Sequence, residues 1–171
     1  MALTPAQLLA LKNDIASDPV LSALPNTADD AFAIAAVYNA DASPDFYVWK
    51  TRLGKHEVTD LTAPGGTTFD WAGPGGYIAR SVAEKDAWRE MWNSTLSCNP
   101  SLPNVRAAFA DIFSGTGSGA TNNRAHILAL GRRLARRIEA LYATGTGTTA
   151  APALMGYEGT ISYNDVLQAR A

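Results

Sequence analysis

Two Pro-Gly-Gly turns, at residues 64–66 and 74–76, interrupt a 171-residue chain that elsewhere has apolar residues at helical spacing. Proline lacks a backbone donor and glycine favours turn conformations, so no regular helix runs through these turns. The flanking sequence has the three-to-four-residue apolar period of amphipathic helices. We therefore expect a mainly α fold, a helical platform from which residues 54–80 depart as a small β-hairpin or an irregular loop.

The helices before residue 54 have clear start and stop signals. Thr4 is followed by proline and, three residues on, by glutamine, which predicts a capped helix that ends at Asp18. A second helix is expected to begin at Thr27, and a third, short one to cover the stretch "DFYVWKTRL" at 45–53. Residues 1–53 are thus predicted to form three N-terminal helices.

Three further helices are expected after the excursion. Ser81 begins a second capping-box pattern, which predicts a helix as far as Trp92, and another helix is expected over 103–115. The longest helix is expected over 121–143, because its apolar residues alternate three and four apart, a spacing that favours packing against another helix. Residues 81–143 are predicted to complete the same domain as the N-terminal helices.

The last segment, residues 144–171, has few charges and several apolar residues, and we expect an extended C-terminal arm. Ordering a segment costs about 1–2 kcal/mol per residue in backbone entropy, so such an arm needs a partner. We expect it to clasp a neighbouring subunit, so its removal should leave the helical domain folded. The side chains expected to make this contact are Leu154, Met155, Tyr157, Ile161, Tyr163 and Val166, and Trp71 and Tyr77 are candidate interface anchors.

Charge is distributed unevenly along the chain. The net charge is −2, and residues 1–60 carry 8 acids and 4 bases, whereas residues 121–171 carry 3 acids and 6 bases. The overall balance gives no case for binding nucleic acid. The gradient would suit copies that stack head to tail, or a chain that meets two different partners.

A cluster of arginines gives the second half its positive charge. Like charges four residues apart on one helix repel, so this cluster requires anions nearby. Those anions could be nucleic-acid phosphates, acids of an adjacent subunit such as Asp29, Asp30, Asp41 and Asp45, or acids of the same chain. The cluster consists of Arg132, Arg133, Arg136 and Arg137 on the helix expected at 121–143, with Arg124 earlier on it.

Residues suited to catalysis are few. The chain has two histidines and a single cysteine, Cys98, so an intrachain disulfide is impossible and a thiolate cluster has no basis. The glycine-rich stretches at 73–80 and 115–123 lack the Gly-Lys-Ser/Thr ending of a phosphate-binding loop. We expect no catalytic site, no metal and no cofactor, and hence a protein that is not an enzyme.

Targeting signals are also missing from the sequence. The N-terminus lacks the basic start of a signal peptide, and no apolar run approaches the 18 residues of a membrane-spanning helix. We expect a soluble protein made in the cytoplasm, with no membrane partner.

Three stretches carry a resemblance to a known family: "LTPAQLLALKNDIASDP", "NPSLPNVRAAF" and "ATGTGTTAAPALMGYEGTISYNDV". They resemble a family of small proteins encoded among the virion-morphogenesis genes of tailed bacteriophages and prophages. The resemblance covers nearly the whole chain, 54–80 being the least similar part. It supplies no catalytic residues.

Within that family context, the expected helices, excursion and arm look like those of head–tail connector, or neck adaptor, proteins. Connectors form homo-oligomeric rings, often of about twelve subunits, below the portal. The resemblance therefore implies a structural virion protein, made in the host cytoplasm, whose partners are itself, the portal and other neck or tail proteins, with possible contact to passing DNA. The alternatives are a tail, baseplate or capsid-associated protein, or a DNA-binding factor that uses the arginines.

Overall fold

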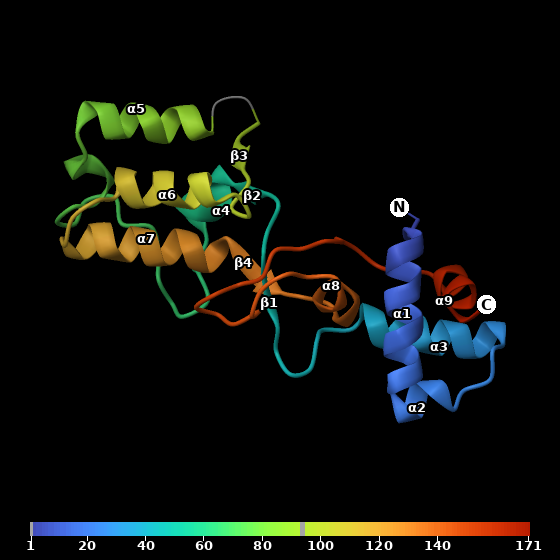
Figure 1. Ribbon diagram of the computed structural model, residues 1–171. Helices are drawn as coiled ribbons and strands as arrows, with labels where there is room; N and C mark the ends of the chain where they lie inside the picture. The colour runs from blue at the N-terminus through green and yellow to red at the C-terminus, as the bar shows by residue number, and fades with distance from the viewer. Residues whose placement is uncertain (1, 93–94) are drawn as a thin grey trace. The chain divides into compact units, whose positions relative to one another are not determined.

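The computed structural model describes residues 2–92 and 95–171 and is mainly α, as expected (Figure 1). The chain divides into two compact units. We call residues 1–48 with 134–171 the terminal unit, and residues 49–133 the central unit. The chain leaves the terminal unit within strand β1 (Tyr47–Trp49) and returns within β4 (Arg132–Leu134), and these strands pair in a two-stranded sheet. The expected boundaries at 53/54, 80/81 and 143/144 do not coincide with this division.

Local capping explains most helices of the terminal unit. The Thr4 hydroxyl accepts from the backbone N–H of Gln7, whose side chain in turn accepts from Thr4 N–H, as the sequence predicted. The Thr27 hydroxyl accepts from the backbone N–H of Asp30 and caps the next long helix, and Ser162 and Asp165 form a further capping box. The helices are α1 (Pro5–Ser17), α2 (Pro19–Ser22), α3 (Ala28–Asn39), α8 (Arg137–Leu141) and α9 (Tyr163–Arg170).

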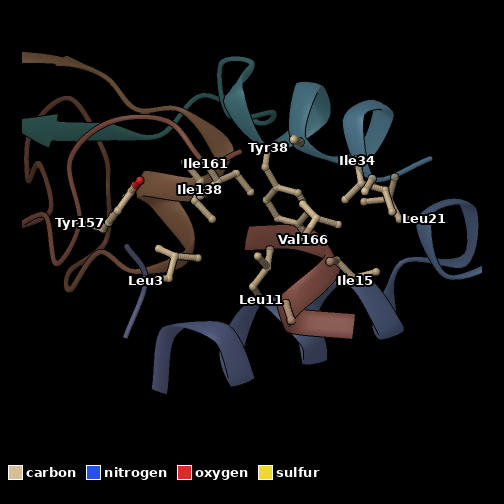
Figure 2. Packing of buried hydrophobic residues seen from close by; sticks show 13 residues of the cluster. Leu3, Leu11, Ile15, Leu21, Ile34, Tyr38, Ile138, Tyr157, Ile161 and Val166 are labelled. Atoms are coloured by element: carbon tan, nitrogen blue, oxygen red, sulfur yellow. The ribbon is translucent and has the colours of Figure 1, made fainter. Parts of the chain in front are cut away.

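The C-terminal segment completes the core of the terminal unit. Figure 2 shows Val166 of α9 close to Tyr38 of α3 and to Leu11 of α1. Tyr157 and Ile161, which precede α9, are buried in the same cluster. The sequence predicted that a neighbouring subunit orders this segment, whereas the segment packs on helices of its own chain.

The other residues expected in the clasping arm also contact the terminal unit. Tyr163 stacks on Phe32 of α3 with ring centroids 4.2 Å apart. Met155 is partly buried and packs in a small cluster with Val48, and Leu154 pairs its backbone with Thr144 but leaves its side chain exposed. Only residues between α8 and α9 keep the extended character that the sequence suggested.

The prediction of a helix over 45–53 is wrong. This stretch instead holds β1 and the short strand β2 (Leu53–Gly54). In the terminal unit the backbone of Tyr47 donates to Gly147 O (2.6 Å) and accepts from Ala153 N (2.9 Å). The backbone groups that would close a helix are thus satisfied by segments distant in sequence, and the aromatic and β-branched residues here suit an extended chain.

The prediction of a single long helix over 121–143 is also wrong. Helix α7 (Ser118–Leu130) ends at Gly131, β4 follows, and α8 begins only at Arg137. Pairing explains the break: Gly131 O accepts from Lys50 N (2.8 Å) within the central unit, and Ala135 N donates to Phe46 O (2.8 Å) within the terminal unit. The apolar spacing continued through this region, but sheet pairing determined its structure.

The central unit surrounds an aromatic core. Its helices are α4 (Lys55–Asp60), the 3₁₀ helix η1 (Tyr77–Ala79), α5 (Val82–Met91), α6 (Pro103–Ile112) and α7, and β2 pairs antiparallel with β3 (Ser97–Cys98). Helices α5, α6 and α7 lie one beside the next (Figure 1). Trp88 on α5 sits among Phe69, Trp92 and Phe113, with ring centroids 5.1–5.5 Å apart.

Residues 54–80 are neither a hairpin nor a detached arm. Between residues 55 and 80, all of them described, the chain forms α4, η1 and connecting turns but no strand. Phe69, in the middle of this stretch, is buried in the aromatic core. Among the described residues, no helix combines the length and the apolar character needed to cross a membrane.

Candidate protein-interaction surfaces

A buried polar face of α7 holds the 61–76 loop in place. The Asn123 side chain, fully buried, accepts from Asp70 N (2.7 Å) and donates to Asp70 O (2.9 Å), as a neighbouring strand would. Asn122 donates to Thr68 O (2.7 Å). One turn on, His126 places its Nε2 2.8 Å from Val58 O and its Nδ1 3.0 Å from Thr67 O. We call Asn122, Asn123 and His126 the loop clip.

These contacts explain why polar side chains occupy a buried helix face. Leaving a buried backbone group unpaired costs about 1–3 kcal/mol, and Asn123 and His126 contact such groups, whereas the Asn122 contact is exposed. The imidazole of His126 is fully buried and both of its nitrogens face backbone carbonyls. His126 therefore links α7 to α4, through Val58 O, and to the loop, through Thr67 O.

The two glycine-rich stretches pack directly on each other. Gly119 N donates to Pro74 O (2.9 Å). A Cβ at Gly117 would lie 2.5 Å from Pro74 O, and one at Gly119 would lie 2.7 Å from Gly76 N, so only glycine permits this approach. The start of α7 is thus occupied by the chain's own backbone.

Three exposed apolar side chains make up what we call the loop patch: Trp71 of the clipped loop, Ile78 of η1 and Val82 at the start of α5. Their side chains are 45%, 64% and 75% exposed. Ile78 N donates to Trp71 O (2.8 Å), and the Trp71 ring meets Tyr77 edge-on at 5.3 Å. Of the two candidate anchors, Trp71 therefore lies at the surface, and Tyr77 supports it from a partly buried position.

A second apolar surface lies on α3 of the terminal unit. One face of this helix, with Ile34 and Tyr38, is buried. The opposite face is also apolar but exposed, with Phe32 57% and Val37 39% accessible. A helix that is apolar around its whole circumference is normally covered on all sides. We call this exposed face the α3 patch: Phe32, Ala33, Ala36 and Val37.

Sequence reasoning missed the α3 patch, although a signal was present. The stretch "AFAIAAV" at 31–37 contains no polar residue, so any helix over it must expose an apolar side unless two partners cover it. The loop clip could not be predicted from the sequence, because Asn123 and Asp70 are 53 residues apart and no local pattern indicates that they are in contact.

Arg137 is neutralised within the terminal unit. Its Nη2 lies 3.0 Å from Asp14 Oδ2 and 3.1 Å from Asp18 Oδ2, and its guanidinium stacks over the ring of Tyr38 at 4.6 Å. The backbone N–H of Leu21 and then Arg137 hold the pKa of Asp18 below its usual value. Burial, followed by the hydrogen bond to Asp14, raises the pKa of Tyr38. The acids that meet Arg137 belong to the same chain.

The remaining arginines do not form one helical face. Arg132 and Arg133 lie in β4, Arg136 precedes α8 and is 3.8 Å from Glu139, and Arg124 on α7 donates to the carbonyls of Phe113 and Gly115. The premise that these residues line one basic helix is therefore wrong, because β4 replaces the middle of that helix.

Cys98 is partly buried against the aromatic core of the central unit. Burial raises the pKa of the Cys98 thiol to about 12, which disfavours the nucleophilic thiolate at neutral pH. Within residues 2–92 and 95–171, no group of three or more histidine, cysteine or acidic side chains is arranged to hold a metal ion.

Comparison with known proteins gives no match: none with a model of a protein family, none with a curated protein sequence and none with a solved structure.

The loop clip makes one direct prediction. Replacing Asn123 with alanine leaves Asp70 N without its partner, while Asp70 O keeps the bond from Tyr77 N (3.1 Å). We expect the substitution to lower the free energy of unfolding by about 1–3 kcal/mol. Amide hydrogen exchange over 67–76 should accelerate. Asn122→Ala, which removes one exposed contact, is the matched control and should change stability by less than about 1 kcal/mol. Equal exchange in the two variants would show that the loop does not depend on Asn123.

Proposed function

We propose that this chain is a structural, non-enzymatic component of a tailed-phage virion, a head–tail connector that assembles into a ring below the portal. The observation that carries the proposal is the pair of exposed apolar patches, one on each unit, on a chain whose His126 and Arg137 side chains make internal contacts. Large exposed apolar patches mark sites of protein association. The resemblance of three stretches to phage morphogenesis proteins supports the same function.

The proposed protein is made in the host cytoplasm and ends in the particle, where its partners are other copies of itself, the portal and adjacent neck or tail proteins. The loop patch suits such a role because the clip and the Trp71–Tyr77 contact hold it in shape before it meets a partner. Preorganised surfaces lose less conformational entropy on binding. A DNA-binding function has less support, since the arginines do not share one helix face.

The test is the copy number of the chain in purified particles of the phage that encodes it, measured by quantitative mass spectrometry. A connector ring predicts a small fixed number, on the order of ten copies per particle. A count of hundreds would instead identify a tail or capsid-associated protein. Intact particles that lack the chain would contradict a virion function of either kind.

A further inference from the structure

We propose that copies of this chain associate head to tail, with the loop patch of one copy docking on the α3 patch of the next. The inference deepens the proposed function and rests on it for its biological setting, because a ring is built from one such contact repeated. The occupant of each patch is thus a second copy of the same chain. Heterologous contacts of this kind close into rings or continue as filaments, whereas a patch that meets its own copy gives only a dimer.

Charge complementarity selects this pairing. The terminal unit carries 9 acidic and 4 basic residues, a formal charge of −5, and the central unit carries 7 acidic and 10 basic residues, a charge of +3. A contact between the terminal unit of one copy and the central unit of the next joins opposite charges. An α3-to-α3 contact would join two units of −5, and such like-charge contacts are unfavourable.

The same complementarity appears beside the two patches. On α3, the exposed Asp29 lies one turn before Phe32, and the helix has no basic residue. Beside the loop patch, the Lys85 ammonium donates to Ile78 O at 2.8 Å, and Lys85 shares a face of α5 with Val82. One acidic residue beside the α3 patch and one cationic residue beside the loop patch thus accompany the apolar side chains.

The shapes of the side chains are also compatible. Ala33 and Ala36 are exposed between Phe32 and Val37, and small residues allow another chain to approach a helix closely. The loop patch offers large side chains, and Trp71 is held by the edge of Tyr77 and by its backbone bond to Ile78. Tryptophan is one of the residue types enriched among the residues that dominate binding energy at protein interfaces.

The test breaks each patch separately and then mixes the products. The α3 variant carries Phe32→Gln and Val37→Gln, and the loop variant carries Ile78→Gln and Val82→Gln. All four side chains are more than a third exposed, so the folds should survive, which circular dichroism checks. A control variant carries Leu9→Gln and Leu61→Gln, which are as exposed but lie outside both patches. Sedimentation velocity measures association in each sample.

Head-to-tail docking predicts that the native chain and the control associate, and that each patch variant alone is weaker by at least about 100-fold. An equimolar mixture of the two variants should form one-to-one dimers and nothing larger, because only one intact interface remains. A mixture that stays monomeric would overturn the proposal. So would a loop variant that associates like the native chain, a control that fails to associate, or a native chain that is monomeric up to about 1 mM.

The outcome separates this inference from the proposed function. Particles that contain the chain at ring stoichiometry, together with a chain that never self-associates in solution, would remove the head-to-tail interface and retain the virion function. A chain that associates in solution but is missing from particles would retain the head-to-tail interface and remove the virion function.

Discussion

Deleting residues 162–171 is expected to unfold the terminal unit, not to free a stable helical domain from its neighbour. The deletion removes Val166 and Ala169, which are fully buried against α1 and α3, and the partly buried Leu167. Burying one valine or leucine side chain contributes about 1.5–3 kcal/mol. The sum approaches the 5–15 kcal/mol that stabilises a typical domain, so little stability should remain.

Hydrogen exchange provides the measurement. In the truncated chain, amides of α1 and α3 should exchange at rates close to those of an unfolded peptide, while amides of α5–α7 in the central unit should stay protected. The control is Gln168→Ala, which changes an exposed position of α9 and should leave protection unchanged. Full protection of α1 and α3 after the deletion would restore the view of the segment as an arm for a neighbour.

Replacing Trp88 with alanine should have the largest effect of any single substitution in the central unit. Trp88 is 1% exposed and touches five other aromatic rings, those of Phe69, Tyr77, Trp92, Phe109 and Phe113. Truncating a fully buried tryptophan leaves a cavity and costs about 3–5 kcal/mol. The free energy of unfolding, measured in urea, should fall by that amount.

Trp71→Ala is the matched control for this substitution, since it removes the same side chain from a surface position. Trp71 contacts only Phe69 and Tyr77 among the aromatic residues of the described chain, and nearly half of its surface is exposed. Its loss should cost less than about 1.5 kcal/mol. Similar losses at both positions would mean that the core of the central unit is not centred on Trp88.

Local signals explain which parts of the fold could be predicted from the sequence. The caps at Thr4, Thr27 and Ser81 act on backbone groups two or three residues away, so the sequence contains both partners, and all three helices begin where expected. The start of α6 at Pro103 follows from the same kind of local rule. These successes are sufficient for the mainly α class.

The failures share a non-local cause. The 46–50 stretch is extended because it bonds to residues near 131–135 and 147–153, which are about a hundred positions away. Those same bonds end α7 at Gly131 and separate the arginines that the apolar spacing had placed on one helix. Periodicity describes what a segment favours in isolation, and pairing between distant segments overrode it here.

The C-terminal segment illustrates the same limit for the candidate interfaces. Its apolar residues correctly indicated that the segment must be covered, but a sequence does not say whether the cover belongs to the same chain or to another. Tyr157, Ile161 and Val166 are covered by their own unit, and the surfaces left for a partner are the loop patch and the α3 patch.

The most direct test of the central claim, that this chain works by associating with itself, is its mass in sedimentation equilibrium as concentration rises. We expect a mass that climbs from the 18.1 kDa of one chain toward a discrete multiple. A mass of one chain at every concentration up to about 1 mM would contradict it.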